Sequence, residues 1–151
     1  ILIYDRVHHA VAAVHAGWRS TVLRIPEAVL QAMAGAYGTR PQDVEAAIGP
    51  GISLEAFEVG NEVYEAFRTV GFPMGEMARR YPAAGDGSGR MEKWHLDLWQ
   101  ANRGLLEGCG VPSTRIHLAG VCTYLHSERF FSARRLGIRS GRILNGIFLT
   151  D

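Results

Sequence analysis

Hydrophobic and polar positions change their spacing several times along this chain, and each spacing predicts a different element. Apolar runs over Ile1 to Tyr4 and Ala10 to His15 are short, which favours two buried strands joined through the polar turn at 5–9. Apolar residues then recur at steps of three and four before Gly38, which predicts a helix with a glycine stop. The recurring residues are Val22, Ile25, Val29 and Met33.

Pro26 restricts where this helix begins. Proline is tolerated in the first turn of a helix, where its missing N–H costs nothing, but it breaks or kinks a helix interior. The helix therefore starts just before Pro26 or bends there.

The remaining pattern continues as alternating strands and helices. Further strands are predicted at 44–48, 55–59, 116–121 and 143–149. Two more helices are predicted, one capped by Asn61 and ending before Gly71, the other capped by Asp97 and ending at Gly108. The glycine-rich stretch 83–90 lacks the spacing of a phosphate-binding loop and is interpreted as a surface connection. This alternation predicts one domain of the α/β class.

Composition limits the classes of function. With 151 residues and 47% hydrophobic content, the chain can bury one sizeable core. A formal net charge of +1 gives no general attraction to nucleic acid, although a local basic cluster stands near the C-terminus. The cluster consists of Arg134, Arg135, Arg139 and Arg142.

Location and completeness can also be predicted. The two cysteines, Cys109 and Cys122, form no disulfide framework or CxxC motif, which favours a reducing compartment and a cytoplasmic protein. No apolar run approaches the ~20 residues of a membrane span, so no membrane partner is expected. The sequence opens directly as a strand and without methionine, so we expect a chain truncated at its N-terminus.

Candidate chemistry begins at His15. This histidine leaves the predicted strand at its C-terminal end, where open sheets commonly gather ligands, and Gly17 lets the chain turn toward a helix. A neutral imidazole can bind a transition metal such as zinc. The same histidine could instead be structural, packed under Trp18 with its nitrogens bonded to the backbone.

Four motifs in order carry a resemblance that covers essentially the whole chain. They are His15-Ala16-Gly17-Trp18-Arg19, Ile48-Gly49-Pro50-Gly51-Ile52, His95-Leu96-Asp97-Leu98 with Asn102, and Cys122-Thr123-Tyr124 followed by Phe130-Phe131-Ser132-Ala133-Arg134-Arg135. This set resembles the laccase-domain family, whose members are also called multicopper polyphenol oxidase, peptidoglycan editing factor, or purine nucleoside phosphorylase of the laccase-domain type. The resemblance implies a layered α/β/β/α sandwich with mixed sheets, of which this chain is the C-terminal portion.

The resemblance also implies a zinc site built from two histidines and one cysteine. The histidine of the His-Ala-Gly-Trp motif corresponds to His15, which is therefore both the expected metal ligand and the expected catalytic residue. The other histidine and the ligand cysteine lie upstream in the family and are absent from this chain, and Cys122 is not assigned to replace them. The chain departs from many relatives by having Gly51 for cysteine, Ser20 for glycine and Ala133 for an aromatic residue.

The implied chemistry is phosphorolysis of a purine nucleoside, with nucleoside and phosphate as small-molecule partners, and deamination of adenosine as a second activity. Arginine can hold phosphate through paired hydrogen bonds, so Arg19, Arg134 and Arg135 are the candidate phosphate-binding residues. If 130–135 is extended, alternation favours Arg134 over Arg135 as the one facing the site. Surface ion pairs are the alternative for each arginine.

Two alternative functions remain. Copper-dependent oxidation of phenols is favoured by one family name, but the six histidines form no His-x-His pair of the kind that multicopper sites use. Editing of a cell-wall precursor by a hydrolase, or a non-catalytic regulatory role, is the other alternative.

Overall fold

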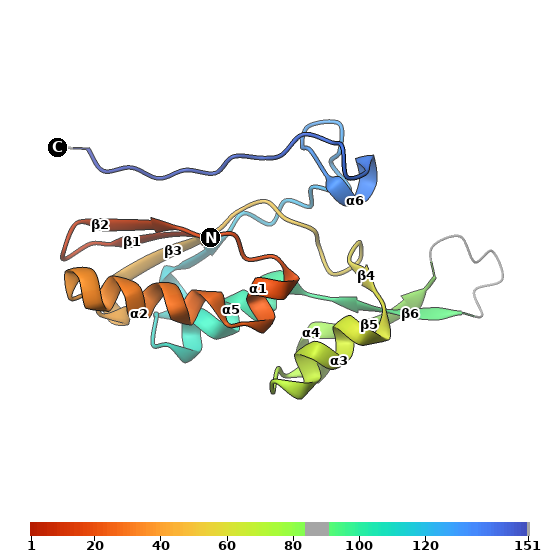
Figure 1. Cartoon of the computed structure of the whole chain (residues 1–151), viewed down its shortest axis with the longest axis horizontal. Coiled ribbons are helices and arrows are strands. Elements are labelled where there is room, and N and C mark those ends of the chain that lie inside the picture. The colour runs from red at the N-terminus through yellow and green to blue at the C-terminus, as the bar shows by residue number, and fades with distance from the viewer. Residues whose placement is uncertain (84–90, 151) are drawn as a thin grey trace.

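The computed structural model describes residues 1–83 and 91–150 and has two β-sheets with helices packed against them (Figure 1). The larger sheet has the strand order β2-β1-β3-β7, and the smaller sheet has the order β4-β6-β5. The strands are β1 Leu2–Asp5, β2 Ala10–Ala13, β3 Val44–Ile48, β4 Glu58–Val59, β5 Ala78–Pro82, β6 Glu92–Leu96 and β7 Ile116–Leu118. Because β3 and β7 are parallel while β1 is antiparallel to both of its neighbours, the expected α/β class with a mixed sheet is confirmed.

Two long helices cover one face of the larger sheet. The helices are α1 Trp18–Val22, α2 Ile25–Tyr37, α3 Asn61–Thr69, α4 Met74–Met77, α5 Leu98–Gly108 and α6 Ala133–Leu136, with 3-10 turns at Pro41–Asp43 and Ser113–Arg115. Leu30 and Met33 of α2 and Leu106 of α5 pack with Ile3 and Val44 of the sheet. No helix among the described residues is long and apolar enough to cross a membrane.

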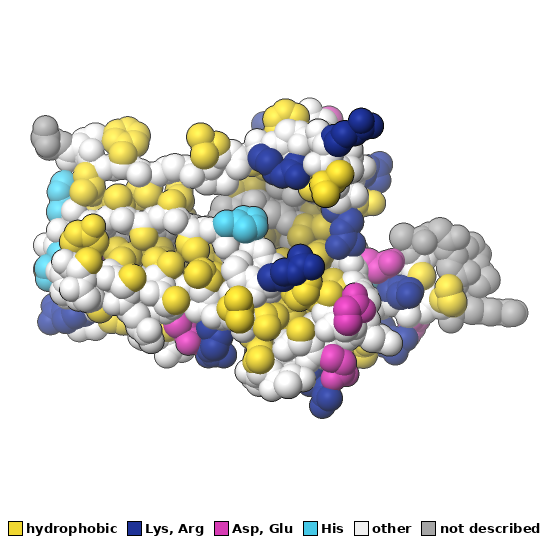
Figure 2. Space-filling model, viewed as in Figure 1, with side chains coloured by type: hydrophobic (Ala, Val, Ile, Leu, Met, Phe, Trp, Pro, Cys, Tyr) yellow, Lys and Arg dark blue, Asp and Glu magenta, His cyan; other side chains and the backbone are white. Residues whose placement is uncertain are grey.

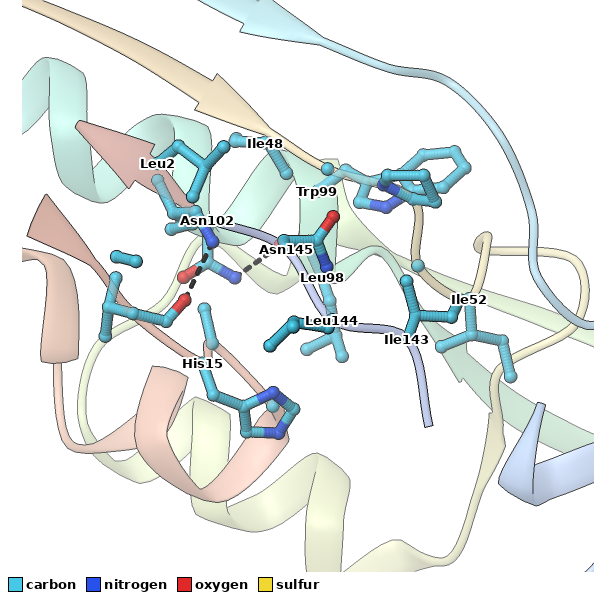
Figure 3. A pocket seen from close by; sticks show the side chains of 18 residues that line it. Leu2, His15, Ile48, Ile52, Leu98, Trp99, Asn102, Ile143, Leu144 and Asn145 are labelled. Carbon is cyan, nitrogen blue, oxygen red and sulfur yellow. Dashed lines mark hydrogen bonds between the residues drawn. The ribbon is translucent and has the colours of Figure 1, made fainter. Parts of the chain in front are cut away.

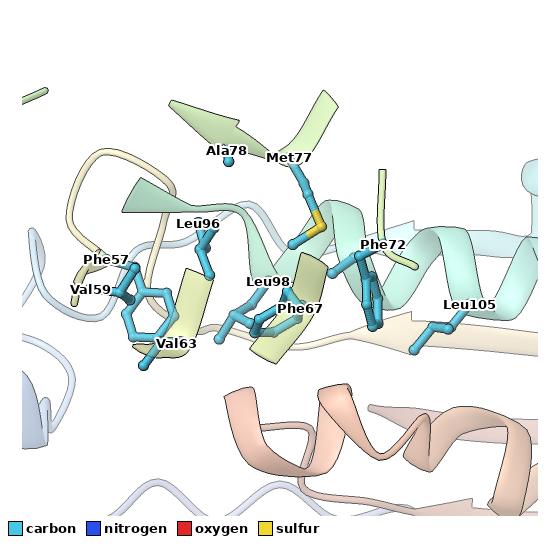
Figure 4. Packing of buried hydrophobic residues seen from close by; sticks show 11 residues of the cluster. Phe57, Val59, Val63, Phe67, Phe72, Met77, Ala78, Leu96, Leu98 and Leu105 are labelled. Atoms are coloured by element: carbon cyan, nitrogen blue, oxygen red, sulfur yellow. The ribbon is translucent and has the colours of Figure 1, made fainter. Parts of the chain in front are cut away.

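A second hydrophobic cluster holds the smaller sheet against α3 and the start of α5 (Figure 4). Phe67 of α3, Met77 and Leu96 are fully buried in it. Leu96 precedes Asp97, whose side chain accepts a hydrogen bond of 2.9 Å from the backbone N–H of Gln100 and so caps α5 as expected. This cluster therefore fixes where α5 begins.

The predicted helix over 22–37 is divided in two. Arg24 adopts a left-handed conformation with φ of 57°, which separates α1 from α2. The helix α2 starts at Ile25, just before Pro26, and Gly38 ends it with φ of 73°, as expected. Of the two alternatives for Pro26, the one in which the helix starts just before it is thus confirmed.

Three other boundary predictions are wrong. Asn61 is the first residue of α3 and not its cap, because Gly60 holds the cap position without a side-chain bond. The strand expected at 55–59 is reduced to Glu58–Val59, because the Ser53 carbonyl accepts bonds from the N–H groups of Ala56 and Phe57 and winds the chain into a turn. The strand expected at 116–121 ends at Leu118.

The C-terminal part differs most from expectation. Residues 143–149 form no strand and pair with none of the described strands, and the segment runs along the side of the larger sheet away from α2 and α5 (Figure 1). Figure 2 shows hydrophobic side chains in a band across this side of the molecule. Leu144 and Phe148 are 94% and 81% exposed. The glycine-rich stretch lies, from residue 84 to 90, outside the described residues.

Candidate functional site at the His15 turn

The His15 turn, residues 15–17, connects β2 to α1. The amino group of Ile1 donates to the Val14 carbonyl at 2.8 Å, and the Val14 N–H donates back to Ile1 at 2.9 Å, so the β1–β2 pairing continues to the residue before His15. Gly17 then caps α1 with an ordinary extended conformation. The histidine is therefore anchored by a strand on one side and a helix on the other.

His15 lies at a cavity of about 440 Å³, here called the His15 cavity (Figure 3). Its walls come from β1, the end of β3, α5 and the C-terminal segment, and they are largely apolar. Leu2, Ile48, Ile52, Leu98 and Leu144 contribute to them. Asn102 and Asn145 supply amide groups to this lining. A cavity of this size with apolar walls and few polar groups is typical of small-molecule sites.

The imidazole of His15 is exposed and has no hydrogen-bond partner among the described residues. The structural alternative, in which the backbone satisfies both ring nitrogens, therefore does not hold in the described part of the chain. Gly17 lies directly against the ring, because a Cβ on Gly17 would stand 2.9 Å from Nε2 of His15. A larger side chain at position 17 would therefore collide with the ring as it stands.

Whereas the ring is unpartnered, the backbone of the His15 turn is firmly bonded. The Ser20 hydroxyl lies 2.9 Å from the His15 carbonyl oxygen and 3.0 Å from that of Gly17, so it can donate to either. The Gly17 carbonyl also accepts from the backbone N–H of Thr21 at 2.8 Å and from the Thr21 hydroxyl at 2.9 Å. The turn therefore presents a free side chain on a fixed backbone.

The three candidate arginines lie outside the His15 cavity. The guanidinium of Arg19 stacks on the Trp18 ring, with its carbon 4.4 Å from the ring centre. Arg135 lies over the ring of Tyr124, with its guanidinium carbon 5.2 Å from the ring centre and a long contact of 3.4 Å to the hydroxyl. Neither arginine lines the cavity beside His15.

Arg134 lines a neighbouring cavity of about 260 Å³, here called the Arg134 cavity. Its guanidinium donates to the Glu58 carbonyl at 2.7 Å and lies over the Phe57 ring. Trp18 and Lys93 also line this cavity, so the His15 turn and the following tryptophan separate the two cavities. Arg134 and Arg135 lie on the helix α6, so the prediction of an extended segment, on which their alternation was based, is wrong.

A metal centre is not complete within the described residues. No group of three or more His, Cys, Asp or Glu side chains there could hold a metal ion, so His15 offers one donor of the three that the family resemblance implies. A free, exposed imidazole can serve as one ligand of a metal ion. The remaining ligands would have to come from outside the described residues.

Cys122 is not in a position to complete this site. It is buried, it does not line the His15 cavity, and its sulfur accepts the Ser53 N–H at 3.3 Å. Burial of the thiol raises its pKa, but the nearby Ser53 side chain and the backbone N–H groups of Leu125, Ser53 and Tyr124 leave that pKa below its ordinary value. These bonds hold the sulfur inside the fold.

The comparisons with known proteins agree with the motifs on which the resemblance rests. Residues 1–150 match the family model described as multi-copper polyphenol oxidoreductase laccase. The chain belongs to this family. A structure of the hypothetical protein YfiH from Bacillus licheniformis superposes with a TM-score of 0.76 at 29% identity, covering 89% of this chain and 48% of that one.

Curated relatives carry names from purine metabolism. A purine nucleoside phosphorylase of Bacteroides thetaiotaomicron is 52% identical over 99% of this chain and 53% of its own length. An adenosine deaminase from an unknown prokaryotic organism is 43% identical over 98% of this chain and 53% of its own length. The chain therefore spans about half the length of the curated relatives it matches.

Sequence reasoning missed most of the cavity wall. It singled out His15, but it did not place Asn102, Trp99 or Asn145 beside it. A signal for Asn102 was available, because an amide stands in the apolar row of Leu98, Ala101 and Leu105 on one face of a helix. Asn145 gave no such signal, because the pattern around it predicted a strand that the structure does not form.

Proposed function

We propose that the protein is a purine nucleoside phosphorylase in which His15 is one ligand of a zinc ion. The observation that carries the proposal is the exposed imidazole of His15, which has no partner in the part of the chain that the structure describes and stands on a fixed backbone at the edge of a cavity large enough for a nucleoside. The names of the relatives supply the reaction class. Cytoplasmic location and the absence of a nucleic-acid partner are part of the same proposal.

The residues of the His15 cavity have distinct tasks in this reaction. Its apolar walls exclude water and offer flat surfaces to a purine ring. The amide of Asn145 can donate and accept hydrogen bonds, which matches the mixed edges of a purine. In phosphorolysis, positive charge develops on the ribose and negative charge on the departing base, so donors near the base stabilise the departing group.

The described residues can supply one ligand of a zinc site. His15 would supply one nitrogen, and the family resemblance assigns two further ligands to residues that this chain does not contain. When bound with an open fourth position, zinc supplies Lewis acidity and lowers the pKa of a coordinated water. A protein carrying all three ligands should bind one zinc per chain, whereas these 151 residues alone should bind zinc weakly.

Phosphate would be held by an arginine near the His15 turn. Arg19 follows the turn directly, and Arg134 reaches the far side of Trp18 together with Lys93. A guanidinium with open donors can grip two oxygens of one phosphate. Arg134 is the stronger candidate, because it lines a recess together with Lys93, although Glu58 and Glu62 also line that recess, whereas Arg135 lies on Tyr124.

Product analysis of the natural protein tests the proposal. The protein is incubated with inosine or adenosine, with and without phosphate, and the products are separated by chromatography. Release of free base together with ribose 1-phosphate, only when phosphate is present, supports the proposal. Absence of phosphate-dependent base release in a zinc-loaded preparation would contradict it.

The same assay separates the two other candidate activities. Conversion of adenosine to inosine without phosphate would indicate the deaminase activity for which one relative is named. Oxidation of a phenol that requires added copper would favour the oxidase activity in the description of the family model. Elemental analysis of the purified protein identifies the bound metal in either case.

A further inference from the structure

A buried pair of polar side chains joins the His15 turn to a helix far away in the sequence. Asn102 of α5 is 2% exposed and Thr21 of α1 is fully buried. The Asn102 Nδ2 lies 3.0 Å from the Thr21 hydroxyl oxygen, across a sequence separation of 81 residues. Buried polar groups are costly unless they are bonded, so this pair needs a structural or functional reason.

The direction of these bonds follows from what each group can donate. The Asn102 amide nitrogen also lies 2.7 Å from the Leu98 carbonyl, which can only accept, so that atom is the donor. When Nδ2 donates to the Thr21 hydroxyl, the hydroxyl proton is free to bond the Gly17 carbonyl at 2.9 Å. Asn102, Thr21 and Gly17 thus form a chain of donors that ends on the His15 turn.

Asn102 and His15 line the same cavity (Figure 3), so one end of this chain of bonds borders the site and the other end lies on the His15 turn. An apolar residue at position 102 would continue the hydrophobic row on α5, and exchanging a satisfied polar pair for apolar groups of equal shape is often neutral for stability. Stability alone therefore gives no reason for a bonded amide at this position.

We infer that Asn102 and Thr21 are positioning residues, which fix the backbone of the His15 turn and thereby aim the imidazole. The hydrogen-bond geometry behind this inference is independent of the proposed function, whereas its consequence for zinc affinity rests on that function. The Ser20 hydroxyl reaches the same turn from a partly exposed position, where water can replace it. Ser20 therefore serves as an internal control for the buried tether.

The test compares Thr21→Val, which keeps the shape and removes the hydroxyl, with Thr21→Ser, which keeps the hydroxyl. In metal-free protein, NMR measures amide exchange at position 21 and the mobility of the His15 ring. We expect Thr21→Val to accelerate amide exchange at least about tenfold and to release the ring, while Thr21→Ser and Ser20→Ala stay close to the wild type. In the natural protein, zinc affinity measured by chelator competition should fall about 10- to 100-fold for Thr21→Val alone.

A destabilised variant that does not touch the turn separates positioning from general loss of stability. Leu30→Val removes a methylene from the core on α2, and it should lower the melting temperature without changing the His15 ring or the zinc affinity. If Thr21→Val has the same amide exchange and the same order of the His15 ring as the wild type, the positioning role is overturned. That outcome does not depend on enzyme activity. If Thr21→Val loses the order of the His15 ring but the wild-type protein shows no phosphorolysis, the proposed function is overturned and the positioning role stands.

Discussion

The β1–β2 hairpin carries His8 near its closed end and His15 at its open end, and the structure holds these two residues in opposite ways. At the closed end, Nδ1 of His8 lies 2.8 Å from the fully buried Asp5 carboxylate, which also accepts the backbone N–H groups of Val7 and His8. At the open end, the His15 ring has no partner among the described residues, while its backbone is bonded several times. A histidine used for structure has its ring fixed, whereas one available to a ligand has its backbone fixed.

The largest effect is expected from removing each histidine in turn. His15→Ala should abolish zinc binding and phosphorolysis with little change in stability, because the ring makes no intramolecular bond in the described structure. His8→Ala should leave both unchanged and should lower the melting temperature, because it strips the Asp5 carboxylate of a donor. Metal content, product chromatography and thermal unfolding measure the two variants, and equal losses of activity in both would break the contrast.

The next effect concerns phosphate at the open end of the hairpin. Arg134→Ala should raise the phosphate KM about ten- to a hundredfold, since a charge-assisted hydrogen bond contributes about 1.5–3 kcal/mol. Arg135→Ala should change it little, because Arg135 lies against Tyr124. Steady-state kinetics at varied phosphate measures both variants. Small and equal changes would mean that the Arg134–Glu58 contact is structural and would turn attention to Arg19.

A smaller effect is expected from filling the space beneath the His15 ring. Gly17→Ala places a Cβ 2.9 Å from Nε2, and because φ of Gly17 is −73°, the backbone accepts alanine while the ring must move. Zinc affinity should fall about tenfold with the melting temperature nearly unchanged. Gly104→Ala in α5 is the matched control, because a Cβ there meets nothing within 4 Å. Unchanged zinc affinity in Gly17→Ala would show that the ring position is not critical.

The closed end should affect stability and not catalysis. Burial raises the pKa of the Asp5 carboxyl, but the nearby Thr39 side chain, the backbone N–H groups of His8 and Val7, and the His8 ring hold it far below its ordinary value overall. Because the folded pKa is depressed, this stabilisation is complete above about pH 4 and is lost as the pH falls further. Asp5→Asn should lower the free energy of unfolding by about 1.5–3 kcal/mol at neutral pH.

Urea titrations at several pH values measure this difference between wild type and Asp5→Asn. The two curves should converge as the pH falls below about 4, because the carboxyl of the unfolded wild-type chain then takes up a proton that the folded carboxyl does not. Asp5→Leu would be an unsuitable comparison, since it also leaves the Val7 and His8 N–H groups without an acceptor. A constant difference at all pH values would show that the Asp5 charge is not the source of the stabilisation.

The sequence predicted those parts of the molecule that depend on local chemistry. Spacing and caps gave β1, β3, α2 and the start of α5, where Pro26, Gly38 and Asp97 each act within one helical turn. The motif gave His15, because a histidine between a strand and a glycine turn is recognisable without the fold. The short β4 and the unpaired segment 143–149 were not predictable in this way, because a strand exists only through a partner that the local pattern does not name.

The sequence could not predict the surroundings of the site for the same reason. Asn102 reaches Thr21 only because α5 packs beside α1, and Arg134 lines the cavity that Trp18 lines and not the His15 cavity. The His15 ligand position is a local property of the chain, whereas its cavity and its supports are properties of the whole fold.

The long span between Thr21 and Asn102 has a consequence for the order of folding. Contacts that close a loop of 81 residues form late, because the entropy of the loop must be lost before the contact contributes any energy. The hairpin and α1 can form early from neighbouring residues, but the His15 turn acquires its last hydrogen bonds only after α5 has docked. A newly made chain therefore holds this histidine loosely until the fold is nearly complete, and a fixed orientation of its ring becomes a sign that folding has finished.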